Sequence, residues 1–456
     1  MARDTVDMQP IESKADLVAW LEKGLKPAEK FRLGTEHEKF AYLRDTLAPV
    51  PYEGARGIGA ILEGLRQRTG WEPILENGTS IGLFDEASGG AISLEPGGQF
   101  ELSGAPLDTL HQTAAELDQH LADVKAVAEP LGIDFLALGM SPKWSRAETP
   151  VMPKSRYKIM TAYMPKVGTL GLDMMYRTST VQVNLDFSSE ADMATKLRVS
   201  LALQPLATAL FANSPFTEGR LNGFRSFRSE IWRDTDNARA GMLPFAFDAG
   251  FGFEQYVDYA LDVPMYFIKR GDTYHDVSGQ SFRALLAGNL ASMPGERATV
   301  SDWANHISTI FPEVRLKRYM EMRGADMGDR DHVLALPAFW VGLLYDPASL
   351  DAAWQLVKGW TAAERQALRD AVPRLGLNAT IRGVSLRDFG RSILMLSRAG
   401  LKARARRDAE GRDETVYLDI LDARIASGRT AADDLIAKFN GAWGGSVDPV
   451  FAAHRM

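Results

Sequence analysis

The chain has no cysteine among its 456 residues, which excludes disulfide bonds, thiolate metal sites and cysteine nucleophiles. It also lacks an apolar run long enough to span a membrane. Neither a Gly-x-Ser-x-Gly nucleophile elbow nor a Gly-x-x-x-x-Gly-Lys-Ser/Thr phosphate loop occurs. The usual signature of serine hydrolases is therefore missing, and any binding of ATP requires something other than a P-loop.

A strong basic character is absent too. Lys and Arg number 52 against 59 Asp and Glu, and the net charge of −7 disfavours nucleic acid as the main partner. Residues 1–7 show neither the apolar core of a signal peptide nor the acid-poor character of a transit peptide. We therefore expect a cytoplasmic protein with small-molecule partners and with no nucleic-acid or membrane partner.

Four short segments, residues 35–40, 94–104, 180–187 and 315–324, are written as strands with polar side chains on one face. Because residues two apart in a strand point the same way, Glu36 shares a face with Glu38. The same alternation groups three further sets: Gln99 and Glu101; Gln182, Asn184 and Asp186; and Arg315, Lys317, Tyr319, Glu321 and Arg323.

These acidic faces have two interpretations. From spacing alone, solvated acids on a surface strand are the favoured explanation for Glu36 and Glu38. If the faces converge instead, two carboxylates about 4 Å apart repel by roughly 4 kcal/mol near a protein surface. Such a cluster needs cations, and ligands that offer only oxygen suit magnesium or manganese.

The order of expected elements favours an α+β fold. Strands and helices mix without regular βαβ alternation, which favours a mostly antiparallel sheet. One domain over residues 1–456 is the simplest organisation, with a mainly helical part from about 337 to 456. We expect helices at 13–25, 54–69, 107–131 and 190–211, strands at 31–45, 74–83, 90–94, 133–140 and 176–187, and an irregular loop at 142–165.

The acidic segments belong to a set of long, unusual stretches: residues 35–40, 94–104, 156–171, 180–187, 211–219, 228–244, 311–326 and 444–451. Together these stretches resemble the plant-type glutamate–cysteine ligases, which occur in plants and some proteobacteria. The resemblance implies a glutamine-synthetase-like fold, in which a curved, mostly antiparallel sheet forms an open funnel with helices on its outer face.

The resemblance also implies a reaction. ATP phosphorylates the γ-carboxylate of glutamate, and the amine of cysteine displaces phosphate to give γ-glutamylcysteine, the first step of glutathione biosynthesis. It implies two or three Mg²⁺ ions, with Mn²⁺ as an alternative, and feedback inhibition by glutathione. Three alternatives stay open: a related ligase that joins glutamate to a different amine, a non-catalytic sensor, and a structural α+β protein.

Site residues follow from the same resemblance. The implied metal ligands are Glu36, Glu38, Glu95, Glu101, Glu321, Gln182 and Asn184. The implied catalytic residues are Arg228, Lys317 and Arg323, and the implied substrate-binding residues are Arg156, Arg177, Arg228, Tyr266 and Trp232. Arginine suits substrate carboxylates because its planar fork binds them with two hydrogen bonds.

Several of these residues have structural alternatives. Glu321 could form a salt bridge with Arg323 or Lys317, and the amides could form a cross-strand polar ladder. Arg177 does not share the face of Gln182 and could be structural. Plant members carry cysteines that form regulatory disulfides, whereas this chain has Ser179 where a thiol is expected. Control by disulfide redox is therefore excluded here.

Overall fold

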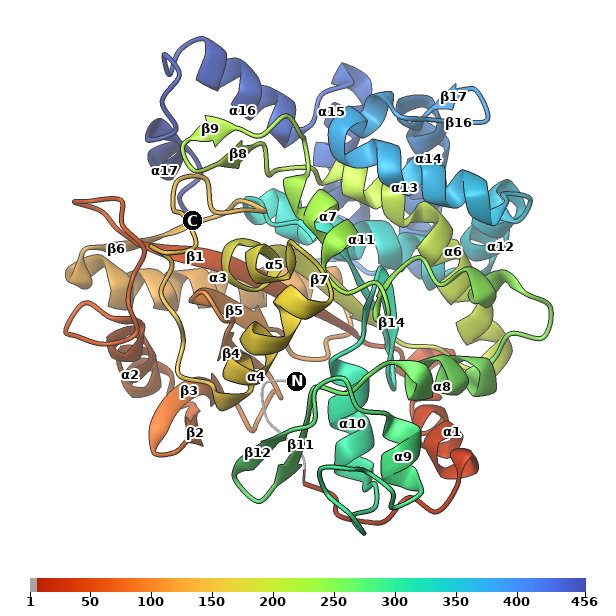
Figure 1. Cartoon of the computed structure of the whole chain (residues 1–456). Helices are drawn as coiled ribbons and strands as arrows, with labels where there is room; N and C mark the ends of the chain where they lie inside the picture. The colour runs from red at the N-terminus through yellow and green to blue at the C-terminus, as the bar shows by residue number, and fades with distance from the viewer. Residues whose placement is uncertain (1–5) are drawn as a thin grey trace.

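The computed structural model describes residues 6–456, so residues 1–5, which belong to the segment examined for a targeting signal, lie outside the described part. Its centre is an open sheet of nine strands in which every neighbouring pair is antiparallel (Figure 1). The strand order is β14-β15-β7-β1-β5-β4-β3-β2, and β6 also pairs with β1. The expected α+β class with an antiparallel sheet is thereby confirmed.

The strands of this sheet are short, and β1 is the longest. Its eleven residues allow it to pair with β5 and β7 along one half and with β6 along the other. The bounds are β1 Leu33–Leu43, β2 Glu72–Glu76, β3 Thr79–Phe84, β4 Ala91–Leu94, β5 Gln99–Ser103, β6 Ile133–Leu136, β7 Thr180–Leu185, β14 Val314–Leu316 and β15 Met320–Asp326.

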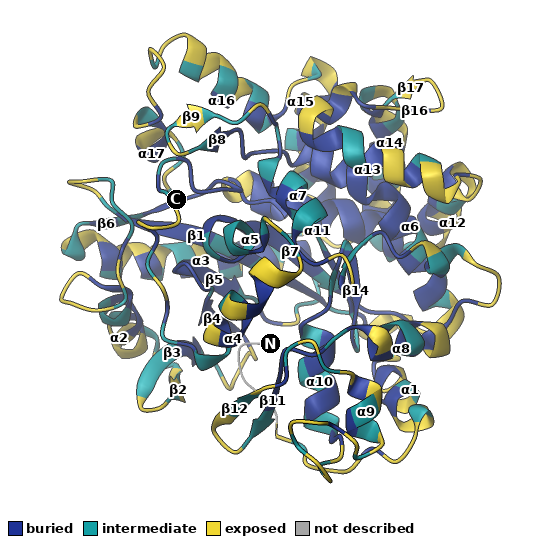
Figure 2. Cartoon of the chain, viewed as in Figure 1, coloured by how far each residue is buried: buried dark blue, intermediate teal, exposed yellow. Residues whose placement is uncertain are grey.

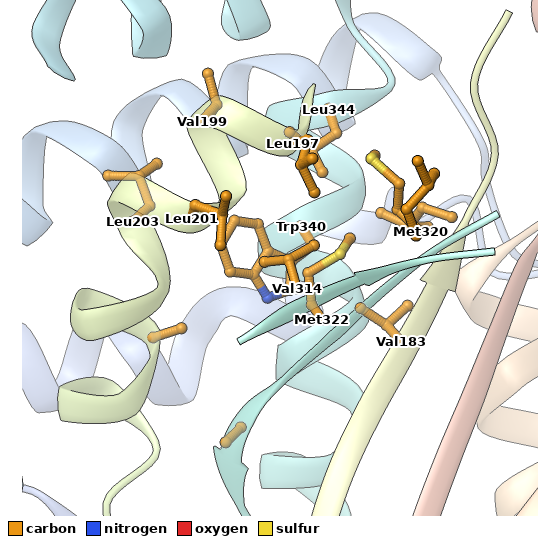
Figure 3. Close-up of a cluster of buried hydrophobic side chains, with 14 of the residues drawn as sticks. Val183, Leu197, Val199, Leu201, Leu203, Val314, Met320, Met322, Trp340 and Leu344 are labelled. Atoms are coloured by element: carbon orange, nitrogen blue, oxygen red, sulfur yellow. The ribbon is translucent and has the colours of Figure 1, made fainter. Parts of the chain in front are cut away.

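One face of the sheet is apolar and carries the main core. Helices α6 (Glu190–Leu210) and α11 (Arg330–Leu344) cover it along β7 and β15. Both helices are buried along most of their length, as expected for helices that are apolar on nearly every side (Figure 2). Figure 3 shows Val183 and Met322 of the sheet gathered with Leu201 of α6 and Trp340 of α11.

Helices α2 (Ile58–Thr69) and α3 (Leu110–Ala128) cover the same face beside β1, β4 and β5. Thr109 caps α3, since its hydroxyl accepts a hydrogen bond from the backbone N–H of Gln112 at 3.1 Å. Gly70 ends α2 in the left-handed conformation at φ 74°, which a residue with a side chain adopts less readily. Glu36 and Glu38 of β1 are thus left for the opposite face of the sheet, whereas His37 and Lys39 are buried on the covered face, against His120 and Phe100.

The last third of the chain is mainly helical, as expected, although α11 begins before residue 337. Its final residues return to the sheet beside β6, where the backbone N–H of Met456 donates to the carbonyl of Phe135 at 3.0 Å. The helices after α11 are α12 Pro347–Val357, α13 Ala362–Leu375, α14 Leu386–Arg404, α15 Asp419–Ser427, α16 Ala431–Asn440 and α17 Pro449–Ala453.

Shorter elements lie around the central sheet. Among residues 6–456 they include three two-stranded hairpins and several short helices, most of them from the middle third of the chain (Figure 1). Their bounds are α1 Lys14–Glu22, α4 Ser155–Tyr163, α5 Gly171–Arg177, β8 Phe216–Thr217, β9 Arg220–Leu221, α7 Phe227–Ile231, β10 Ala240–Gly241, α8 Phe253–Asp262, β11 Phe267–Arg270, β12 Thr273–Asp276, α9 Phe282–Leu286, α10 Val300–Ser308, β13 Phe311–Pro312, β16 Thr380–Ile381 and β17 Val384–Ser385.

Four local predictions need correction. The expected strand at 74–83 is the hairpin β2–β3, because the chain turns at Asn77 and Gly78. The expected loop at 142–165 contains helix α4. The expected strand at 176–187 begins only at Thr180, because the preceding residues close helix α5. The expected single strand at 315–324 is the hairpin β14–β15, since the backbone N–H of Lys317 bonds to the carbonyl of Tyr319 and turns the chain.

Among residues 6–456, no helix taken singly has the length and apolar composition needed to cross a membrane. The pair α11 and α12, bent by 89°, meets the test of length and composition only when the two helices are taken together.

Candidate active site

The strand register brings the acidic faces together. Glu38 of β1 lies directly opposite Glu101 of β5, and Glu321 of β15 lies opposite Asn184 of β7. Opposite residues in an antiparallel pair project from the same face of the sheet. These side chains therefore converge on the face that α6 and α11 do not cover. With the exception of Glu321 and Asn184, the acids and amides predicted as ligands line one pocket of about 160 Å³ there.

Glu36 and Glu38 are partly buried in this pocket and repelled by other acids. Asn184 Nδ2 donates to Glu36 Oε1 at 2.7 Å, and the backbone N–H of Thr180 donates to Glu38 Oε2 at 3.0 Å. Burial and the neighbouring carboxylates, Glu101 among them, raise the pKa of Glu36 and raise that of Glu38 well above its usual value. The acidic faces therefore converge rather than face bulk water.

Glu101 is held by two serine hydroxyls from its own sheet. Ser93 Oγ donates to Glu101 Oε2 at 2.5 Å, and Ser103 Oγ donates to Glu101 Oε1 at 3.1 Å. Glu95 follows β4 in the same pocket. The next turn requires Gly97, because a Cβ there would lie 2.1 Å from the carbonyl oxygen of Tyr176. This close approach positions the end of β4 against helix α5.

Glu321 is completely buried and surrounded by cations. Arg315 Nη2 binds both of its carboxylate oxygens, at 2.7 and 2.9 Å, and Lys317 Nζ lies 2.7 Å from Oε2. Arg323 Nη1 also contacts Oε1. Burial alone would raise the pKa of Glu321, but these three charges hold it well below its usual value. The salt bridges considered from the sequence are present, with Arg315 as a third partner.

A smaller hollow lies beside the pocket, and two of the predicted substrate residues, Arg228 and Trp232, line it. Arg228 is 3% exposed, and its Nη2 donates to the carbonyl of Arg323 at 2.9 Å. Trp232 lines the same hollow as Arg228, and its indole N–H is buried without a partner among residues 6–456. Arg323 and Phe311 line both the hollow and the main pocket. Arg156 lines the main pocket directly.

Arg177 and Tyr266 line neither the pocket nor the hollow beside it, so their substrate-binding role stays a prediction. Arg177 ends helix α5, where its Nη1 pairs with Asp173 at 3.0 Å and with Glu218 at 2.9 Å. Tyr266 is 1% exposed, and the guanidinium of Arg239 stacks 3.7 Å from the centre of its ring. Consecutive side chains point in opposite directions here, so the next residue, Phe267, lines the pocket instead.

Some pocket residues escaped the sequence-based prediction. Ser103 could have been found, because it stands two residues after Glu101 in the same strand. Ser93 and Met160 carried no such signal. Lys154 lies in the segment that was expected to be an irregular loop, and it lines the pocket beside Arg156.

The donor chemistry of the pocket suits a hard divalent cation, although no three acidic or histidine side chains among residues 6–456 stand close enough to form a metal site as they are. Carboxylate and amide oxygens are the ligands that Mg²⁺ and Mn²⁺ prefer. Asn184 Oδ1 is buried, and the described residues offer it no partner. The raised pKa of Glu38 marks negative charge that lacks compensation.

Comparison with known proteins decides the family. Residues 32–453 match the family described as glutamate-cysteine ligase family 2. The chain belongs to this family. It is 57% identical over 439 residues to the chloroplastic glutamate–cysteine ligase of Arabidopsis thaliana, and the match covers 96% of this chain and 82% of that protein. The chloroplastic ligase B of Oryza sativa subsp. japonica is 56% identical, covering 98% and 88%.

A solved structure supports the fold. The glutamate–cysteine ligase of Francisella tularensis, in complex with AMP, aligns with a TM-score of 0.55 over 91% of this chain and 86% of that chain, at 13% identity. This likeness supports the expected fold, whereas the family and the similar plant enzymes show that the chain catalyses the first step of glutathione biosynthesis.

The cytoplasmic location expected from the sequence is contradicted. The relatives from Arabidopsis thaliana, Nicotiana tabacum and Oryza sativa are all chloroplastic enzymes. The composition of the first few residues is too small a basis for predicting a compartment.

Proposed function

We propose that this ligase uses ATP to activate the γ-carboxylate of glutamate as an acyl phosphate, which the amine of cysteine then attacks. The observation that carries the proposal is that one pocket gathers carboxylates and cations from different strands. Glu36, Glu38 and Glu101 come from β1 and β5, whereas Lys317 and Arg323 come from the β14–β15 hairpin beyond β7. This arrangement can hold a polyphosphate and a carboxylate close together, as phosphoryl transfer requires.

Glu36, Glu38, Glu95 and Glu101 would hold Mg²⁺ or Mn²⁺, with the amide oxygens of Gln182 and Asn184 as further ligands. When bound, the metal ions would neutralise charge between the phosphates and the incoming carboxylate. Gln182 Oε1 accepts a hydrogen bond from Arg323 Nη1 at 2.8 Å, so the ligand set and the cations share contacts. Glu321 becomes available as a ligand only when its cations turn toward phosphate oxygens.

The cations of the pocket perform the positioning. Lys317 and Arg323 would stabilise negative charge on the transferred phosphoryl group, because both point into a water-poor site from β14–β15. Arg228 and Arg156 would hold the carboxylates of the amino acid substrates, with the indole N–H of Trp232 as a further donor. In the second half-reaction, the C–N bond forms as phosphate leaves, and the amine proton passes to phosphate or solvent.

Feedback inhibition by glutathione fits the same geometry. Glutathione carries a γ-glutamyl group, so it presents the same α-carboxylate and amine as the glutamate substrate. We propose that its γ-glutamyl group competes with glutamate for Arg228 and Trp232, which line the small hollow beside the pocket. The single catalytic domain over residues 1–456 stays a prediction.

The test is ADP release with Mg²⁺ and ATP, measured with glutamate alone and then with glutamate and cysteine. We expect release to require both amino acids and to match γ-glutamylcysteine in amount. EDTA should abolish release, and Glu38→Gln should do the same, whereas Glu63→Gln on the exposed side of α2 should not. Release with glutamate and another amine, but not with cysteine, would contradict the proposed acceptor; full activity in EDTA would contradict the metal.

A further inference from the structure

The reaction pocket adjoins a larger cavity that has no assigned role. This outer cavity measures about 460 Å³ and is bordered by the hairpins β2–β3 and β11–β12, with Glu76 and Tyr274 among its lining residues. Two residues line both the outer cavity and the reaction pocket: Lys154 and Arg156. Two positively charged side chains therefore lie where the two cavities meet.

Lys154 is held firmly at this junction. Its backbone N–H donates to the carbonyl of Met152 at 2.9 Å, and the N–H of Met152 donates to the carbonyl of Pro96 at 3.0 Å. Its ammonium donates to the carbonyl of Leu94 at 2.7 Å. Leu94 directly precedes Glu95, so the ammonium lies at the strand end that carries one of the proposed metal ligands.

Among residues 6–456, no carboxylate forms a direct ion pair with Lys154, and Glu95, Glu101 and Glu76 attract its ammonium only from a distance. The side chain is 6% exposed, and of its three N–H donors only the one to Leu94 is used. By contrast, Lys317 and Arg323 both pair with Glu321. Burial, together with the charge of Arg156, lowers the pKa of Lys154 to about 8, which still leaves the ammonium mostly protonated at pH 7. A buried, unpaired cation with two free donors is unfavourable unless a ligand completes it.

We propose that Lys154 contacts substrate directly, by binding an anionic oxygen at the junction of the two cavities. This inference rests on the proposed reaction, in which every substrate is an anion or carries a carboxylate. The oxygen belongs either to an amino acid carboxylate or to a phosphate of the nucleotide. Both sources present the same chemistry to an ammonium group, and kinetics can separate them.

The test uses Lys154→Met and Lys154→Gln in the full-length enzyme, with kcat and KM measured separately for ATP, glutamate and cysteine. Loss of a charged hydrogen bond should raise the KM of the contacted substrate, or lower kcat/KM for it, by about 10-fold to 100-fold. Lys154→Arg should recover most of the loss. Lys154→Gln keeps a donor for Leu94, so it tests the charge even where methionine impairs folding.

Two further variants separate contact from structure. Lys158→Met removes an exposed lysine one turn along α4 and should leave all constants unchanged. Tyr157→Phe removes the other side-chain donor to the carbonyl of Leu94, which Tyr157 Oη reaches at 2.7 Å. If Lys154 only braces that carbonyl, Tyr157→Phe should reproduce the defect of Lys154→Gln.

The outcomes are distinct. A selective change for ATP assigns the oxygen to phosphate, and a selective change for one amino acid assigns it to that carboxylate. Unchanged kcat/KM for all three substrates overturns the inference, as does an equal defect in Tyr157→Phe. The unmodified enzyme is assayed in parallel: if it makes no γ-glutamylcysteine, the proposed function fails, whereas an active enzyme with unaffected Lys154 variants refutes only this inference.

Discussion

Replacing Glu321 by glutamine is the most informative perturbation of the site. The substitution preserves shape but removes the one carboxylate among residues 6–456 that lies within salt-bridge distance of Arg315, Lys317 and Arg323. All four side chains are largely buried, so water cannot take over the role of the carboxylate. Removing one partner from a buried ion pair typically costs about 3 to 5 kcal/mol, because the remaining charge stays buried and unpaired.

That loss of stability converts into a measurable shift of the melting temperature. An unfolding entropy of about 2 cal/mol/K per residue gives roughly 1 kcal/mol/K for this chain of 456 residues. We therefore expect Glu321→Gln to lower the melting temperature by about 3 to 5 °C. The assay is thermal unfolding in EDTA without nucleotide, so that stability is measured apart from metal and substrate binding.

A matched control is available in Glu414. This carboxylate is equally buried, but among residues 6–456 it pairs with one cation, Arg404, at 2.7 Å, and burial raises its pKa rather than lowering it. Glu414→Gln should therefore cost less. If the melting temperature of Glu321→Gln in EDTA equals or exceeds that of the unmodified protein, the three cations do not depend on Glu321 for charge compensation. That result would refute the reasoning about the site's charge.

Three further predictions follow from other groups. Glu38→Gln should abolish product formation yet leave the melting temperature in EDTA unchanged or higher, because it removes a carboxylate that burial and its neighbours disfavour; a clear loss of stability would contradict this. Burial raises the pKa of Glu116 from 4.5 to about 7, so the folded state favours the neutral carboxyl group. The free energy of unfolding therefore falls by about 3 kcal/mol as the pH rises from 4.5 to 7, where the buried carboxylate must ionise. Glu116→Gln should flatten that part of the decline in urea unfolding between pH 5 and pH 8, and an unchanged slope would exclude Glu116 as its source. Dithiothreitol should leave activity unchanged with a small thiol-free acceptor, because the chain has no cysteine, and a severalfold response would contradict it.

The polar alternation of the strands was readable in advance because it is local. Glu36 and Glu38 share a face in any regular strand, and the hydrophobic residues between the polar ones of β7 indicate which face is buried. The same local logic located most helices to within a few residues. It failed at 315–324, where alternation alone does not reveal that the chain reverses between Lys317 and Tyr319.

Side-chain placement outside regular strands was harder to predict. Tyr266 and Phe267 are neighbours, and a shift of one residue decides which ring enters the pocket. Lys154 carried no periodic signal because it precedes a helix in a proline-rich segment. Its importance depends on the carbonyl of Leu94, which is distant in sequence.

By itself, the sequence determined that the chain has no cysteine side chain of its own, that its strands have one acidic face, and that its motifs are those of glutamate–cysteine ligases. Only the tertiary structure decided that Glu38 meets Glu101 and that Glu321 is enclosed by three cations. The physical reason is that strand register and charge compensation depend on contacts between segments far apart in the chain, whereas composition and alternation are properties of single segments.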